Sequence, residues 1–237
     1  MLIVPQNWAE NLFRVRSHMN NAARAAGRDP TQITIVAVSK AQPLEAIRAV
    51  RALDVMDFGE NYPQEAMRKI DALDDAAVRW HFIGHLQANK TKLIAERFAW
   101  VHSIDRLQIA RRLSAQRPFH APPLNVCLQV KLADEPSKAG VAPSQVEALA
   151  DEVAALDRLK LRGLMCVPPA TEDVAQQRRW FAELRDLQAA LNRHGHALDV
   201  LSMGMSGDYV AAVQEGATHL RIGTAIFGER PTTPEDN

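Results

Sequence analysis

The stretch ITIVAVSK, Ile33–Lys40, joins a run of apolar and β-branched residues to a serine and a terminal lysine. A run that is apolar on both faces is typical of a strand in a parallel sheet that helices cover on both sides. Further segments of this kind recur along the chain and predict eight strands. We expect them at Ile33–Lys40, Val55–Glu60, Trp80–Leu86, Trp100–Ile104, Leu124–Leu132, Leu161–Val167, Val200–Met205 and Leu220–Phe227.

Segments with helical periodicity precede and separate these strands. The first segment, Trp8 to about Ala25, lies before the first strand, places Leu12, Val15 and Met19 on one face, and is expected to end at Gly27. The others are expected at Pro43–Leu53, Pro63–Leu73, Leu107–Gln116, Pro143–Leu156, Val174–Arg193 and Tyr209–Glu215. The alternation predicts an α/β protein, a (β/α)8 TIM barrel with an extra N-terminal helix, and an open doubly wound sheet is the alternative. We expect one domain over residues 1–230 and a flexible tail over 231–237.

Composition excludes several classes of function. In 237 residues, lysine plus arginine and aspartate plus glutamate both total 28, so no net field attracts nucleic acid or an anionic membrane. No apolar run approaches the roughly 18 residues of a membrane span, and the N-terminus lacks the pattern of an export signal. Cys127 and Cys166 lie in apolar runs without a metal-binding pattern, which fits a reducing compartment. We therefore expect a soluble, cytoplasmic protein without a metal.

The ends of the predicted strands carry the polar residues, and in a TIM barrel the active site forms there. After strands seven and eight, SMGMSGDY (Ser202–Tyr209) and RIGT (Arg221–Thr224) can direct backbone N–H groups and hydroxyls at one spot, the usual phosphate position of this architecture. Glycine turns that merely close a barrel are the alternative.

Lys40 is the candidate nucleophile, because an amine emerging from an apolar strand into a barrel mouth is poorly solvated and suited to bond a carbonyl carbon. A solvated lysine that ends a strand is the alternative. A lysine together with a phosphate site implies a phosphorylated aldehyde, of which pyridoxal 5′-phosphate (PLP) is the commonest cofactor.

Other polar residues near the strand ends have simpler explanations. His81, His85 and His102 are expected to be structural or to support the site residues from behind, rather than to act as an acid or base. Glu60 with Asn61 either binds the cofactor or lysine or caps the next helix. Lys90, Lys92 and Lys138 are expected to form a solvated face, and a cationic rim around the mouth of the barrel is the alternative.

Eight blocks in order resemble one family. They are IVAVSKAQP, DFGENYPQE, WHFIGHLQANK, VHSIDR, EPSKAGV, RGLMCVPP, LSMGMSGDY and LRIGTAIFGER, spanning about Ile33 to Arg230. Together they are similar to the pyridoxal phosphate homeostasis proteins, also called the YggS or PROSC family. The resemblance implies a fold-type III PLP protein with a barrel like the N-terminal domain of alanine racemase.

The same resemblance implies a set of cofactor-binding residues. It makes Lys40 the lysine that holds PLP as an aldimine, and it places Asn61 near the cofactor and Arg221 opposite the pyridine nitrogen. On the phosphate side it implies Ser202, Ser206, Gly223 and Thr224, with Met203 close by. His85 and Lys131 depart from residues common in the family and put only the lining of the mouth in doubt.

The expected function is a PLP carrier that takes part in intracellular PLP homeostasis and, through it, amino acid and keto acid balance. A guanidinium at the ring nitrogen disfavours its protonation, so carbanion chemistry is expected to be weak.

The sequence ends soon after the last strand, without the further β-domain of alanine racemase, which suggests a monomer. PLP-dependent apo-enzymes are the expected recipients. A PLP-dependent racemase or weak lyase is the alternative, and a Schiff-base aldolase is a third possibility.

Overall fold

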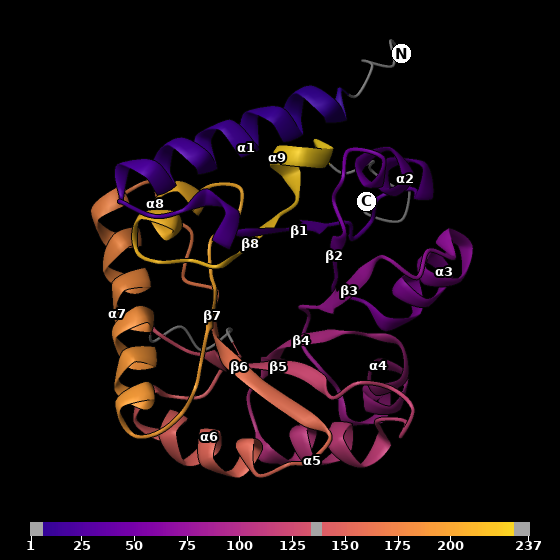
Figure 1. The fold of residues 1–237 in the computed structure, drawn as a ribbon, viewed down its shortest axis with the longest axis vertical. Helices are drawn as coiled ribbons and strands as arrows, with labels where there is room; N and C mark the ends of the chain where they lie inside the picture. Colours follow the sequence, from indigo (N-terminus) through magenta and orange to yellow (C-terminus); the bar gives the residue numbers. More distant parts are fainter. Residues whose placement is uncertain (1–6, 134–138, 230–237) are drawn as a thin grey trace, which may run out of the picture.

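The computed structural model describes residues 7–133 and 139–229. Within them, eight parallel strands close into a barrel in the order β1 to β8 (Figure 1), and β1 pairs with both β2 and β8. This closure confirms the predicted TIM barrel and excludes the open sheet. The strands are β1 Thr34–Val38, β2 Asp57–Glu60, β3 Arg79–Phe82, β4 Trp100–Ile104, β5 Leu124–Val130, β6 Leu159–Cys166, β7 Val200–Ser202 and β8 His219–Ile222. The predicted tail, residues 231–237, lies outside the described residues.

Helices surround the barrel. They are α1 Trp8–Ala25, α2 Leu44–Arg51, α3 Pro63–Leu73, α4 Thr91–Arg97, α5 Leu107–Gln116, α6 Val146–Ala154, α7 Val174–Arg193, α8 Tyr209–Gln214 and α9 Thr224–Phe227. The extra N-terminal helix α1 packs against α8, α9 and α2 on the β1 and β8 side of the barrel (Figure 1). Its predicted apolar stripe is buried, and the Asn7 side chain caps its first turn by accepting a hydrogen bond from the Glu10 N–H.

The prediction of a strand over Leu220–Phe227 was wrong for its second half. β8 ends at Ile222, and the residues from Thr224 form the single helical turn α9, in which the Ile226 and Phe227 N–H groups donate to the Gly223 carbonyl. A short apolar run has no periodicity that separates a strand from a buried helix, so the sequence could not decide between them. Helix α4 was not predicted, and β3 and β7 end before Leu86 and Met205, the ends expected for them.

Both cysteines are buried, and burial raises the pKa of each thiol to about 12. In residues 7–133 and 139–229 there is no helix of sufficient length and apolarity to span a membrane.

An ion pair joins two neighbouring strands at the end of the barrel where the strands begin. Asp57 on β2 accepts two hydrogen bonds from the Arg79 guanidinium on β3, at 2.7 and 2.6 Å, and a third contact from His81 Nε2 at 2.9 Å. Burial would raise the pKa of Asp57, but these partners outweigh it and lower the pKa to about 2.

Asp57→Asn is expected to reduce the free energy of unfolding by about 2 kcal/mol near pH 7. Because the folded pKa lies below the unfolded one, the contribution of Asp57 is present above about pH 4 and is lost as the pH falls towards 2. Urea unfolding of the wild type and the variant at several pH values from 7 to 3 measures the difference. A difference that does not shrink as the pH falls would contradict this account.

Candidate functional site

A cavity of about 340 Å³ lies at the end of the barrel where the strands finish. Its lining comes from residues at or just after the ends of β1, β2, β3, β6, β7 and β8: Val38, Lys40, Asn61, Ile83, Val167, Met205, Ser206, Gly207, Arg221, Gly223 and Thr224. This is the face on which TIM barrels carry their active sites. The sequence-predicted residues Lys40, Asn61, Ser206, Arg221, Gly223 and Thr224 are brought together here.

Two of the predicted site residues do not line this cavity. Ser202 and Met203 are both fully buried, and Ser202 accepts a hydrogen bond from Arg221 Nη1 at 2.7 Å. Strand β7 ends at Ser202, so this residue still lies within the sheet, whereas Ser206 follows the turn at Gly204, where φ is +94°. The structure thus separates the two serines of SMGMS by their depth in the barrel.

Lys40 is held in place by a buried polar cluster behind it. The preceding residue, Ser39, donates its hydroxyl to Glu60 Oε1 at 2.6 Å, and its carbonyl accepts from Lys69 Nζ at 2.5 Å. Lys69 also donates to Glu60 Oε1 at 2.8 Å, and burial raises the pKa of Glu60 despite this cation. The backbone immediately before Lys40 is therefore fixed to β2 and α3.

The residue after Lys40 is fixed as well. The Ala41 N–H donates to Glu65 Oε1 at 2.6 Å, and Glu65 in turn accepts from Lys69 at 2.5 Å. Ala41 has φ of +58°, a conformation that costs a non-glycine residue energy and needs such support. Sequence reasoning missed Glu65 and Lys69. Their spacing of four within a predicted helix was the available signal, but it is typical of exposed pairs too.

Four residues that line the cavity on its β7 and β8 side have backbone N–H groups that donate no hydrogen bond to another described residue. They are Ser206, Gly207, Gly223 and Thr224. Unsatisfied N–H groups from two adjacent loops form the kind of concave donor set that binds phosphate. The Ser206 hydroxyl accepts from the Ala225 N–H at 3.1 Å, which ties the two loops together.

Arg221 brings a positive charge to the floor of this cavity. Its guanidinium is buried and donates to Ser202 Oγ at 2.7 Å and to the Cys166 carbonyl at 2.8 Å. Among the described acidic residues none forms a direct ion pair with it, and burial lowers the pKa of Arg221. A buried cation without a direct counter-charge favours an anionic ligand in the cavity that it lines.

Asn61 supplies a further polar group. Its Oδ1 atom is buried and has no hydrogen-bond partner among the described residues, although nearly all buried polar atoms have one. The volume of the cavity lies in the range of small-molecule sites. A primary amine, four N–H donors, an unpartnered amide and a buried guanidinium therefore fit a phosphorylated aldehyde such as PLP.

Apart from Lys40, the described lining of this cavity contains no side chain that commonly acts as a general acid or base. Its described lining contains no carboxylate, histidine or tyrosine. His81 and His102 are buried inside the barrel, His85 is exposed, and neither Lys90 nor Lys92 is part of the lining. Lys138 lies outside the described residues.

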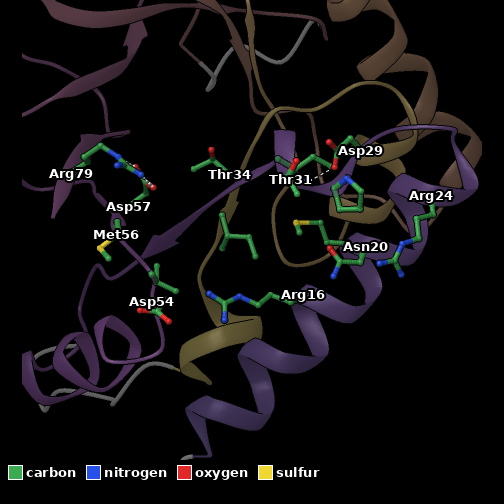
Figure 2. A pocket seen from close by; sticks show the side chains of 15 residues that line it. Arg16, Asn20, Arg24, Asp29, Thr31, Thr34, Asp54, Met56, Asp57 and Arg79 are labelled. Atoms are coloured by element: carbon green, nitrogen blue, oxygen red, sulfur yellow. Dashed lines mark hydrogen bonds and ion pairs between the residues drawn. The ribbon is translucent and has the colours of Figure 1, made fainter. Parts of the chain in front are cut away.

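A larger cavity, of about 520 Å³, lies at the opposite end of the barrel. Figure 2 shows its lining, which includes Arg16 on α1, Thr34 at the start of β1 and the Asp57–Arg79 pair. Because TIM barrels carry their catalytic groups at the other face, we assign the principal site to the cavity around Lys40.

Comparison with known sequences agrees with this geometry. The model of the family described as alanine racemase, N-terminal domain, matches residues 8–231. The pyridoxal phosphate homeostasis protein of Pseudomonas aeruginosa is 54% identical over 222 residues, which cover 94% of this chain and 95% of that protein. Its Escherichia coli counterpart is 45% identical over 225 residues, covering 94% and 96%.

Solved structures extend the comparison. PipY of Synechococcus elongatus, solved with PLP bound, has a TM-score of 0.84 and 36% identity, covering 94% of this chain and 100% of that chain. Alanine racemase of Clostridium difficile shares the fold, with a TM-score of 0.74, 14% identity and coverage of 96% of this chain and 58% of the racemase. The chain therefore belongs to the family of pyridoxal phosphate homeostasis proteins.

Proposed function

We propose that this chain binds PLP in the cavity at the C-terminal ends of the strands. The observation that carries the proposal is that one cavity joins the amine of Lys40, the N–H groups of Ser206, Gly207, Gly223 and Thr224, and the buried Arg221. When bound, PLP supplies an aldehyde that reacts reversibly with a primary amine. Lys40 would hold the aldehyde carbon, and the two loops would bind the phosphate. The PLP bound to PipY supports this assignment.

We further propose that the protein is a carrier of PLP without robust turnover. Racemisation needs an acid and a base on opposite faces of the substrate carbon, and Lys40 and Arg221 are the only titratable side chains in the described lining. Tyr62 is exposed and absent from that lining, and the Tyr209 hydroxyl contacts His18 at 3.1 Å. A guanidinium at the ring nitrogen would also disfavour the protonated ring that stabilises carbanions.

The cellular role that follows is to hold and release PLP in the cytoplasm, with consequences for amino acid and keto acid balance. The names of the curated relatives support a role in PLP homeostasis. We propose PLP-dependent apo-enzymes as recipients and a monomer as the working form.

Titration of the purified protein with PLP tests the proposal. We expect saturable binding with a new absorbance band in the visible region, and borohydride reduction is expected to attach the cofactor to the peptide that contains Lys40. A colourless protein that binds no PLP would instead suit an aldolase. The same sample is expected to racemise alanine negligibly, whereas substantial turnover that is lost in Lys40→Ala would overturn the carrier function in favour of an enzyme.

Thr224→Val tests the phosphate site. Loss of one hydroxyl from an anion-binding site is expected to weaken PLP binding by about 1 to 3 kcal/mol, roughly 5- to 150-fold in dissociation constant. Equilibrium titration measures the change, and Thr31→Val, in the cavity at the opposite end, is the matched control. Equal affinities of the two variants would show that Thr224 does not contact the phosphate.

A further inference from the structure

A continuous line of hydrogen bonds runs through the interior of the barrel from Arg221 to Asp57. Arg221 Nη1 lies 2.7 Å from Ser202 Oγ, which lies 2.7 Å from His102 Nδ1. His102 Nε2 lies 2.9 Å from His81 Nδ1, and His81 Nε2 lies 2.9 Å from Asp57 Oδ1. The five residues come from β8, β7, β4, β3 and β2, and all of them are buried. We call them the interior chain.

The two ends of the interior chain, together with neutral imidazole rings, fix the direction of every hydrogen bond in it. A guanidinium has no acceptor, so Arg221 must donate to Ser202 Oγ, whose hydroxyl can still either donate to His102 Nδ1 or accept a second hydrogen bond from it. An ionised carboxylate has no donor, so Asp57 must accept from His81 Nε2. In a neutral His81 ring, Nδ1 is then an acceptor, so His102 donates to it from Nε2, and in a neutral His102 ring Nδ1 accepts from the Ser202 hydroxyl. Neutral imidazoles at both positions therefore carry their hydrogen on Nε2.

The surroundings of the two histidines favour this neutral state. Trp100 stacks on His81 with ring centroids 5.5 Å apart and an interplanar angle of 5°, and His219 packs beside both Trp100 and His102. Burial lowers the pKa of His81 and of His102, and it lowers the pKa of His219 to about 3. Hydrogen bonds in a chain polarise one another, so each bond between these neutral rings and their neighbours strengthens the next one.

We infer that Asp57, His81, His102 and Ser202 are positioning residues for Arg221. They fix the acceptor towards which the guanidinium points, and the chain that they form ends on Asp57 at the opposite end of the barrel, whereas the carboxylate that acts on the charge of Arg221 is that of Asp208. This inference rests on the proposed function, because it explains how the guanidinium is oriented in a cavity that has no carboxylate in its described lining. It also explains why Ser202 is fully buried, since this residue orients Arg221 instead of contacting the ligand.

The far end of the interior chain lies at the second cavity. Figure 2 shows Asp57 and Arg79 joined there. Arg79 keeps Asp57 ionised, because its two hydrogen bonds stabilise the carboxylate. The pair thus sets the accepting end of the chain.

The first test is the tautomer of each histidine in the cofactor-free protein, measured by long-range nitrogen–proton NMR. His81→Gln and His102→Gln assign the two sets of signals. We expect His81 and His102 to be neutral with hydrogen on Nε2. A ring protonated on Nδ1, or a charged ring, at either position would overturn the inference. The measurement uses no PLP, so it is independent of whether the proposed function is correct.

The second test separates a role behind Arg221 from direct contact with the ligand. In Ser202→Ala, Arg221 loses its acceptor, and in His102→Asn the amide at 102 no longer sets the direction of the Ser202 hydroxyl. Both variants are expected to bind PLP about tenfold more weakly than the wild type, the loss typical of one hydrogen bond. The visible absorbance of the bound cofactor is expected to change in both.

Asp199→Asn is the matched control, because Asp199 also accepts two hydrogen bonds from an arginine, Arg162, at 2.7 and 2.6 Å but is exposed and outside the interior chain. Its PLP affinity is expected to equal that of the wild type. If Ser202→Ala binds PLP more weakly while His102→Asn matches the control, then Ser202 acts by contact with the ligand, and the positioning role is refuted. If either variant fails to fold, the NMR result decides.

Discussion

Lys40→Ala is expected to abolish covalent retention of PLP. In the proposed site no other primary amine is part of the described lining, so an aldehyde held by the two loops has nothing else to bond. The variant is expected to lose the visible absorbance band, to release the cofactor on dialysis and to incorporate none after borohydride reduction. The intact mass of the reduced protein measures this directly, because the wild type gains one equivalent of cofactor and the variant gains none.

Lys90→Ala is the control for this experiment. Lys90 belongs to the loop after β3, at the same end of the barrel as Lys40, but it does not line the cavity. Its variant is expected to retain the cofactor as the wild type does. Retention of a full equivalent by Lys40→Ala would show that another amine holds the aldehyde and would remove the basis for assigning this role to the first strand.

Weak, non-covalent binding is expected to survive in Lys40→Ala. The N–H groups of Ser206, Gly207, Gly223 and Thr224 and the charge of Arg221 are independent of the amine. The variant should therefore still bind PLP reversibly, and inorganic phosphate should compete with it. Residual binding would show that the N–H groups and Arg221 bind PLP without help from Lys40. Loss of all affinity would indicate that they contribute little without the covalent bond.

The sequence predicts the location of the site well because parallel strands bring their C-terminal ends to one face. A residue that directly follows one strand must then lie near the residues that follow the other strands. This alone places Lys40, Asn61 and Gly223 around one cavity, without any knowledge of loop geometry. The family resemblance supplied the roles of individual residues.

The sequence did not show how deep in the barrel each side chain lies. Ser202 and Ser206 look equivalent in SMGMS, but only Ser206 lines the cavity, because β7 continues to Ser202. His81 and His102 were expected to be structural, and their link to Arg221 arises from strands that are distant in sequence. Pairings across a barrel depend on register, which a single sequence does not encode locally.

Lys69→Met is expected to have the largest effect on stability, about 3 to 5 kcal/mol of unfolding free energy. Lys69 is buried and is bonded to Glu60, Glu65 and the Ser39 carbonyl, so its removal leaves the carboxylate of Glu60 buried without a cation. One oxygen of Glu60, Oε2, already has no hydrogen-bond partner among the described residues. The backbone on both sides of Lys40 would lose its support, so PLP binding should weaken in parallel.

The effect of Lys69→Met is expected to depend on pH in a defined direction. Burial raises the folded pKa of Glu60 even beside Lys69, and without the cation this pKa should rise further. A carboxyl group with a raised folded pKa favours the folded state when protonated and loses that advantage as the pH rises through the folded pKa. Urea unfolding, followed by tryptophan fluorescence, should therefore show a larger loss at pH 8 than at pH 5.

Two variants show whether the loss comes from the buried charge. Lys92→Met removes a lysine that also pairs with a glutamate four residues away, Glu96, but at 3.9 Å and on the surface, so it should cost less than about 0.5 kcal/mol. In Glu60→Gln/Lys69→Met no charge remains at position 60, and part of the stability should return. If Lys69→Met costs no more than Lys92→Met, the cluster does not hold Lys40 in place. If the double variant is less stable than Lys69→Met, the hydrogen bonds of Glu60 matter more than its charge, since Glu60 then stabilises the strand end even without its cation.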